Sequence, residues 1–74
     1  EVHSAKGRAD AIVYTPNYIY VFEFKLNGTA EEALLQIEEK GYAVSYQTDK
    51  RKLIKVGIEF SAEERNVKRW LTAA

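Results

Sequence analysis

The sequence contains no cysteine, one histidine, one proline and four glycines among its 74 residues. The absence of cysteine excludes disulfide bonds and thiolate metal sites. No apolar run approaches the roughly 20 residues that a membrane-spanning helix needs. We therefore expect neither a membrane span nor a secretory signal, no contact with a membrane, and a cytoplasmic location.

The chain also lacks an excess of charge of either sign, because 11 basic residues balance 11 acidic ones. No global field therefore draws it to nucleic acid. The charges are uneven, since residues 1–49 hold 4 Lys or Arg against 8 Asp or Glu, and residues 50–74 hold 7 against 3. This asymmetry allows a basic stripe over the second half, although solvated surface is the simpler interpretation of most of its members: Lys50, Arg51, Lys52, Lys55, Lys68 and Arg69.

The composition, with 46% hydrophobic and 30% charged residues, is that of a folded globular domain. Seventy-four residues provide a small core and one domain at most. The chain begins at Glu1 rather than at Met. We expect residues 1–74 to be a single domain taken from the C-terminal part of a longer protein.

The most informative stretch is residues 18–26, YIYVFEFKL, which alternate as a β-strand does. One face carries only aromatic and apolar side chains. The other begins apolar and ends in Glu23 and Lys25, about 7 Å apart along the strand. Such a pair is most simply a solvated edge pair, but charges on a strand this apolar also indicate where a functional site could lie.

Residues 8–15 form a second strand candidate, joined to the first by the turn at residues 15–18, TPNY. So short a turn predicts an antiparallel hairpin. Counting back from the turn brings Asp10 to the level of Glu23, within one residue. Two neighbouring carboxylates make a simple edge pair a weaker interpretation.

A capping box at Thr29 and Glu32 predicts a helix start. The apolar spacing predicts one helix continuing to about Tyr46, and the alternative is that the helix ends at Gly41. The expected core stripe is Ala30, Ala33, Leu34, Ile37, Gly41 and Val44, and a second stripe, exposed in a two-layer domain, is Leu35, Tyr42 and Tyr46. Gln36 and Lys40, four residues apart, flank the core stripe and can lean over the sheet.

Residues 47–51 read as a polar loop, and residues 52–60 as a strand with Ile54, Val56, Ile58 and Phe60 inward and Lys55, Gly57 and Glu59 outward. Residues 62–73 are ambiguous. Their apolar spacing slightly favours a helix, but residues 66–72 also alternate acceptably as an edge strand.

Asp10 and Glu23 on adjacent strands would form a hard-oxygen site suited to Mg²⁺ or Mn²⁺. A lysine two residues further on, Lys25, can position a water molecule or neutralise charge developing on a phosphate. These parts suffice for hydrolysis of a phosphodiester bond.

Three blocks in this order, residues 7–10 (GRAD), 19–25 (IYVFEFK) and 33–43 (ALLQIEEKGYA), resemble the PD-(D/E)xK nuclease superfamily. They are most similar to a bacterial subfamily in which the nuclease-like domain follows an AAA-type ATPase-like region. The resemblance covers essentially the whole chain, with Ala9 where the motif has proline.

The resemblance implies an α/β (α+β) fold, a restriction-endonuclease-like core fragment with a central mixed sheet, an antiparallel hairpin, one main helix and one or two further strands. The first helix of the family core is either absent from this protein or cut off from this sequence, and the last segment becomes a strand. Asp10 and Glu23 would ligate the metal with the Phe24 carbonyl, and Lys25 would be the catalytic lysine. Gln36 would contribute from the helix, supported by Tyr42.

The implied function is a metal-dependent nuclease acting on DNA or RNA, with an ATPase region in the parent chain. An incomplete fold with an exposed stripe could also form a homodimer. The alternative is an idle interaction or nucleic-acid-binding module that docks a partner through Leu35, Tyr42 and Tyr46. A purely structural cap on an ATPase is a third hypothesis. His3 has no assigned role.

Overall fold

The computed structural model describes residues 9–74. It contains β1 (Ala11–Tyr14), β2 (Tyr18–Leu26), α1 (Ala30–Lys40), α2 (Tyr42–Ser45), β3 (Lys52–Ser61) and β4 (Asn66–Ala73). His3 and the expected start of a strand at residue 8 lie outside the described residues. No helix in the described part is long and apolar enough to cross a membrane.

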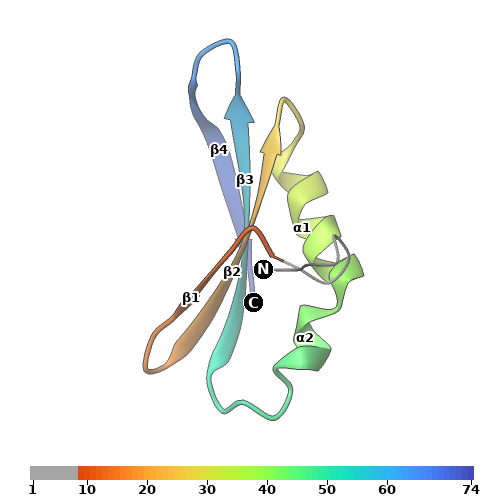
Figure 1. Cartoon of the computed structure of the whole chain (residues 1–74), viewed down its shortest axis with the longest axis vertical. Coiled ribbons are helices and arrows are strands. Elements are labelled where there is room, and N and C mark those ends of the chain that lie inside the picture. Colours follow the sequence, from red (N-terminus) through yellow and green to blue (C-terminus); the bar gives the residue numbers. More distant parts are fainter. Residues whose placement is uncertain (1–8) are drawn as a thin grey trace, which may run out of the picture.

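The four strands form one mixed sheet in the order β1-β2-β3-β4 (Figure 1). β1 pairs antiparallel with β2, β2 pairs parallel with β3, and β3 pairs antiparallel with β4. Because parallel strands need a crossover connection, the chain returns from the end of β2 to the start of β3 through the two helices. This architecture confirms the predicted α+β fold class.

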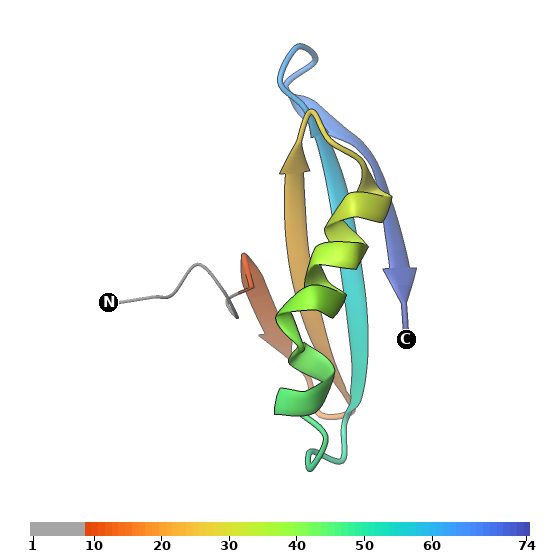
Figure 2. The ribbon, with the colours of Figure 1, turned by 90° about the vertical axis from the view of Figure 1, so that its right-hand side faces the viewer.

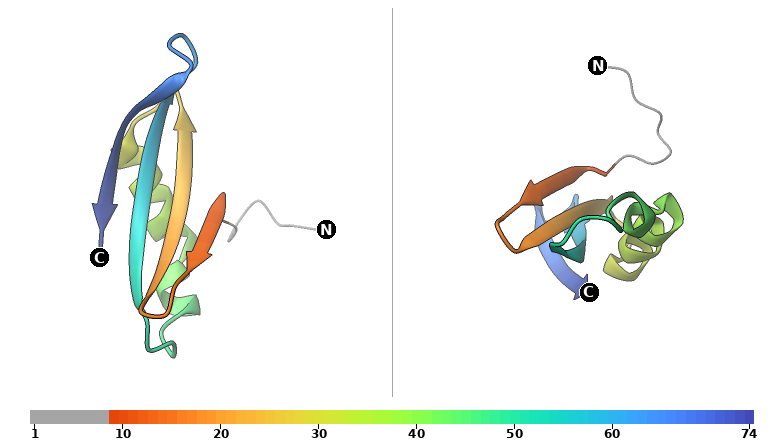
Figure 3. Two further views of the ribbon diagram at one scale, coloured as in Figure 1. Left: turned by 90° about the vertical axis from the view of Figure 1, so that its left-hand side faces the viewer. Right: turned by 90° about the horizontal axis from the view of Figure 1, so that it is seen from below.

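Helix α1 lies along one face of the sheet, over β2 and β3, and runs opposite to them (Figure 2). The core between the two layers contains Ile19 and Val21 from β2 and Ala33 and Ile37 from α1, all fully buried. Within residues 9–74 no helix covers the other face, as the left view of Figure 3 makes plain.

The uncovered face carries the aromatic side of β2. Tyr18, Tyr20, Phe22 and Phe24 follow one another along the strand with ring centroids 5.8, 6.4 and 6.5 Å apart. Tyr18 and Phe24 are about two-fifths exposed, at 40% and 38%. The predicted alternation of β2 is therefore confirmed, but α1 packs on the side that ends in Glu23 and Lys25.

The same alternation corrects the prediction for β3. Glu23 lies opposite Gly57 and Lys25 opposite Glu59 in the parallel register. The face of β3 that was expected to point outward, with Lys55, Gly57 and Glu59, is therefore the one under α1. Gly57 is where the helix approaches most closely, because a Cβ there would lie 2.5 Å from the Ala30 carbonyl oxygen.

Helix α1 starts as the capping box predicts. The Glu32 N–H donates to Thr29 Oγ1 at 3.0 Å, and the Thr29 N–H donates to Glu32 Oε1 at 2.9 Å. The helix ends at Gly41, whose φ of 73° is left-handed and favours glycine. The prediction of one helix continuing to about Tyr46 is wrong, and the alternative of an end at Gly41 is correct.

The break at Gly41 redirects the side chains that follow it. Tyr42 is 5% exposed and joins the core, whereas Val44 is 70% exposed. The sequence analysis placed Tyr42 on the exposed stripe and Val44 in the core. Both predictions are wrong, because they continued the spacing of α1 through the glycine. Tyr46 is partly buried and packs against the core, and only Leu35, 58% exposed, lies in the solvent as predicted.

Residues 66–73 form strand β4, paired with β3 from Lys55↔Ala73 to Ser61↔Asn66. The helical spacing of this segment was misleading, and the strand implied by the family resemblance is confirmed. In the β3–β4 turn, the Glu64 N–H donates to Ser61 Oγ at 3.1 Å.

Candidate functional site

The β1–β2 hairpin brings Asp10 beside Glu23. The turn is closed by the Thr15 N–H, which donates to the Tyr18 carbonyl at 2.8 Å. The register runs from Tyr14↔Ile19 to Ala11↔Phe22, so Asp10, the next residue back, reaches the level of Glu23.

The Asp10 carboxylate is held by the main chain of β2. Its Oδ2 accepts a hydrogen bond of 2.8 Å from the Phe24 N–H, and its own N–H donates to the Phe22 carbonyl at 3.2 Å. The carboxylate therefore lies against the peptide unit that joins Glu23 to Phe24, at the end of the hairpin remote from the turn. Asp10 itself is exposed.

Glu23 is a buried carboxylate, 3% exposed. Lys40, the last residue of α1, donates from Nζ to Oε1 at 3.2 Å and to Oε2 at 3.1 Å. A buried carboxylate requires such compensation because an isolated charge in the protein interior is too costly. The prediction that Lys40 leans over the sheet is confirmed, although no role in a site was assigned to it.

The Phe24 carbonyl and Lys25 follow directly on β2. A strand residue directs its N–H and C=O to the same neighbour, so the Phe24 carbonyl points to the edge where Asp10 is bound. Lys25 shares the face of Glu23 and lies opposite Glu59 in the register. Glu59 already binds Arg69 and the Ala30 N–H, so neutralising Glu59 does not require Lys25.

Gln36 is half-buried on α1, one turn before Lys40 on the same side of the helix. Because α1 runs opposite to β2 (Figure 2), this turn lies in the direction in which β2 proceeds from Glu23 to Lys25. Tyr42 is buried just beyond the end of α1. Helix α1 thus presents Gln36 and Lys40 on the face of the sheet that carries Glu23 and Lys25.

These groups fit a divalent cation by their chemistry. Asp10 and Glu23 provide carboxylate oxygens and Phe24 provides a carbonyl oxygen, the hard donors that Mg²⁺ and Mn²⁺ prefer. Residues 9–74 contain no group of three or more His, Asp or Glu side chains that could hold a metal. Two carboxylates with one carbonyl leave the rest of the coordination sphere to water, which Mg²⁺ commonly retains.

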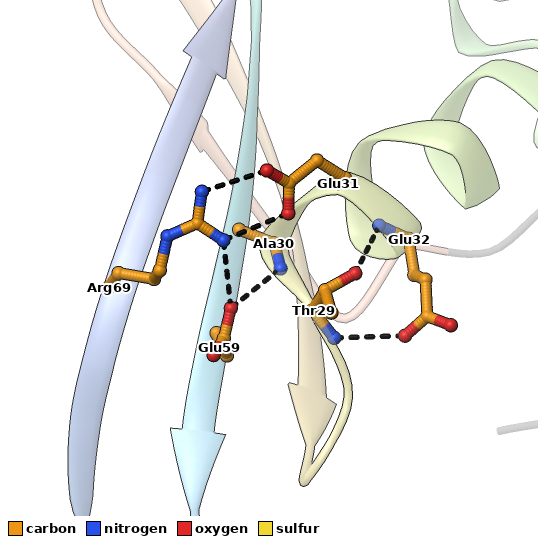
Figure 4. Close-up of polar contacts among 6 residues, drawn as sticks. All are labelled: Thr29, Ala30, Glu31, Glu32, Glu59 and Arg69. Carbon is orange, nitrogen blue, oxygen red and sulfur yellow. Dashed lines mark hydrogen bonds and ion pairs between the residues drawn. The ribbon is translucent and has the colours of Figure 1, made fainter.

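A second polar cluster fixes the start of α1 (Figure 4). Glu59, 8% exposed, accepts hydrogen bonds of 3.1 Å from the Ala30 N–H and from Arg69 Nη1. Arg69 also donates to both carboxylate oxygens of Glu31 at 2.8 Å. These bonds lower the pKa of Glu31 to about 2, and those to Glu31 and then Glu59 raise the pKa of Arg69.

This cluster ties β3, β4 and α1 together, and it explains two residues that the sequence interpretation left on the surface. Glu59 was assigned outward and Arg69 to a basic stripe. The sequence signal for this cluster was the predicted start of a helix after Thr29. A carboxylate such as Glu59 is stabilised there by exposed N–H groups and by the helix dipole, and Arg69 binds that carboxylate.

Three of the six members of the possible basic stripe, Arg51, Lys55 and Arg69, form ion pairs. Arg51 donates from Nε and Nη2 to Asp49 at 2.9 and 2.7 Å, which lowers the pKa of Asp49 to about 2. Lys55 binds Glu38. The Arg51 guanidinium also lies 5.2 Å from the centre of the Tyr14 ring. Solvated and paired surface is therefore the correct interpretation for these residues.

The Tyr14 hydroxyl is 2.8 Å from the Tyr46 hydroxyl, which joins β1 to the segment after α2. This hydrogen bond and burial raise the pKa of Tyr46 to about 12. The turn end of β1 is thus fastened by side chains, whereas Asp10 at its other end is fastened by main chain of β2.

Comparisons with known proteins point to one family. The model of the PD-(D/E)XK nuclease superfamily matches residues 1–70. An uncharacterized protein in the vnfD 5′ region of Azotobacter chroococcum mcd 1 is 36% identical over 66 residues, which cover 86% of this chain and 13% of that protein. No solved structure was found to match the chain. Since the family model spans nearly the whole chain, the protein belongs to the PD-(D/E)XK nuclease superfamily.

Proposed function

We propose that the domain is a metal-dependent nuclease that hydrolyses phosphodiester bonds of DNA or RNA with Mg²⁺ or Mn²⁺. The observation that carries this proposal is the meeting of Asp10 and Glu23 at one level of two paired strands, with Lys25 two residues further along β2. Membership of the nuclease superfamily supports the same chemistry.

In this proposal the carboxylates of Asp10 and Glu23 and the carbonyl of Phe24 hold the ion. A divalent ion so bound polarises a phosphoryl oxygen and lowers the pKa of its water. The Lys25 ammonium orients the attacking water or neutralises charge on the phosphate. Gln36 adds an amide from α1 to the same site.

The domain would act as part of a larger protein. The chain spans only 13% of the length of the Azotobacter relative, which supports a nuclease domain within a much longer polypeptide. We place it in the cytoplasm, attached to an ATPase-like region, with self-association into a homodimer as a further element of the proposal.

The test is cleavage of supercoiled plasmid DNA, single-stranded DNA and structured RNA in Mg²⁺ or Mn²⁺, with EDTA as the metal-free control. Asp10→Asn retains an oxygen that can accept the Phe24 hydrogen bond, and Glu23→Gln and Lys25→Met preserve side-chain size. Each is expected to lower the cleavage rate by about 10² to 10³, the range for loss of one stabilising group.

The matched control is Lys52→Met, which removes an exposed lysine at the far end of β3 and should leave the rate unchanged. Cleavage at the wild-type rate by Asp10→Asn or Lys25→Met would refute the assignment of the site.

The alternative, an idle interaction module, required an exposed stripe of Leu35, Tyr42 and Tyr46. Tyr42 is 5% exposed and Tyr46 packs against the core, so that surface does not form.

A further inference from the structure

The ion pair between Lys40 and Glu23 differs from the other ion pairs of residues 9–74. Its side chains are 11% and 4% exposed, whereas each other pair has at least one side chain exposed by 32% or more. Removing two charges from water is costly, and such a pair is weak evidence of a purely stabilising role. Glu23, which this ammonium contacts, is also one of the two carboxylates proposed to bind the metal.

The Lys40 ammonium lies at nearly the same distance from both oxygens of the Glu23 carboxylate. The distances from Lys40 Nζ to Oε1 and Oε2 are 3.2 and 3.1 Å. Both oxygens are therefore engaged by the ammonium. A divalent ion ligated by Glu23 needs at least one of the same oxygens.

The local fold explains why the ammonium is there. Lys40 is the last residue of α1, where the carbonyl end of the helix favours a cation. Gly41 ends the helix immediately afterwards, and Gly57, opposite Glu23 on β3, lets α1 lie close to the sheet. The close packing of α1 thus brings its last side chain to Glu23.

We propose that Lys40 is a positioning residue that takes the place of the divalent ion on Glu23 in the metal-free protein. Its ammonium compensates the charge of the buried carboxylate and orients it, and metal binding requires the ammonium to yield at least one oxygen. This inference rests on the proposed function, since it concerns the same metal site.

Two cations on one buried carboxylate repel each other, and the repulsion is poorly screened away from solvent. The ammonium and the metal are therefore negatively coupled, and the coupling is reciprocal. Removing the ammonium should tighten metal binding. A lysine that served only to hold Glu23 in place would give the opposite result, because its loss would leave the ligand disordered.

The experiment is calorimetric titration of the full chain with Mn²⁺, comparing wild type with Lys40→Gln, which keeps a donor and removes the charge. The dissociation constant for Mn²⁺ is expected to fall by about fivefold or more, the lower end of usual coupling factors. The matched control is Lys55→Gln, since Lys55 pairs with Glu38 from the same face of the sheet. It should leave the Mn²⁺ affinity within about twofold of wild type, below that range.

Lys40→Met is the stronger variant, because it leaves Glu23 without this cation. Its melting temperature should be lower than that of wild type without metal, and Mn²⁺ should raise it by more than it raises that of wild type, since tighter binding gives greater stabilisation. If this variant is unfolded without metal, Mn²⁺ is expected to fold it, as measured by circular dichroism.

An Mn²⁺ affinity of Lys40→Gln equal to or weaker than that of wild type would overturn the inference. Where wild type binds Mn²⁺ and Glu23→Gln does not, such an affinity of Lys40→Gln overturns the role of Lys40 alone, and the proposed function stands. If no variant binds Mn²⁺ and wild type does not either, the metal site and the role of Lys40 fail together.

Discussion

Gly57 is the position at which the contact between sheet and helix is most sharply testable. A Cβ at this residue would lie 2.5 Å from the Ala30 carbonyl oxygen, 3.0 Å from Ala33 Cβ and 3.1 Å from the Leu34 nitrogen. Restoring an ordinary contact of 3.4 Å to the oxygen requires α1 to retreat by about 0.9 Å. We predict that Gly57→Ala is strongly destabilising.

The expected loss is about 3 kcal/mol, the upper part of the range for overpacking a core. A chain of 74 residues has an unfolding free energy of about 4 to 11 kcal/mol, so the loss is a large fraction of it. The melting temperature should fall by about 12 to 24 °C. The same displacement would draw Lys40 away from Glu23.

The assay is urea denaturation followed by circular dichroism at 222 nm, since Trp70 is 64% exposed and a poor probe of the core. Gly41→Asn is the matched control, because nothing lies within 4 Å of a Cβ at Gly41 and Asn tolerates its left-handed φ. It should cost less than about 1 kcal/mol. Ala33→Gly should not rescue Gly57→Ala, because the tightest contact is with main chain. A loss below about 0.5 kcal/mol in Gly57→Ala, the usual range for neutral surface changes, would refute the described packing of α1.

Arg69→Gln should lower the unfolding free energy more than Lys68→Gln does, because it removes the cation that binds the buried Glu59 carboxylate, whereas Lys68→Gln should change it by less than about 0.5 kcal/mol; urea denaturation measures both. The pKa of Glu31 is lowered from 4.5 to about 2, so its contribution is complete above pH 4.5 and is lost as the pH falls toward 2. Glu31→Gln should therefore lose less stability than wild type over this window, and an identical pH profile would contradict the ion pair. Tyr14→Phe should shift the pKa of Tyr46 down from about 12 toward 10, as measured by ultraviolet absorbance during alkaline titration.

The features that the sequence predicted well depend on near neighbours. The Thr29–Glu32 capping box, the Pro16 turn and the alternation of β2 are each determined within a few residues. The level of Asp10 against Glu23 followed from the turn, because a two-residue hairpin loop fixes the register of both strands. These local signals were enough to predict that Asp10 and Glu23 lie at the same level of the hairpin.

The errors concern choices that only tertiary contacts decide. Alternation shows that β3 has two faces but not which one meets the helix. Apolar side chains were assigned inward, but Glu23 and Glu59 are compensated by Lys40 and Arg69, so the charged faces can be buried. At Gly41 the apolar spacing continued, and the burial of Tyr42 after a left-handed residue is not visible in the pattern.

The pairing of Lys40 with Glu23 could be predicted only in part. The position of Lys40 on the flank of α1 was predictable from its spacing to Gln36. Its partner was not, because the distance to β2 depends on how closely α1 approaches at Gly57. The site residues Lys25 and Gln36 keep the roles assigned by resemblance as predictions.

The unequal lengths of the two strands that carry the acidic residues have a consequence for motion. β2 pairs with β3 over nine residues, whereas β1 contributes four, and Asp10 lies just outside that short ladder. A short ladder at the edge of a sheet opens at a lower free-energy cost than a long central one, so the aspartate should visit detached states far more often than the glutamate. An ion bound by both carboxylates would hold β1 against β2. Hydrogen exchange of the amides from Ala11 to Tyr14 should then be slower with the ion than without it.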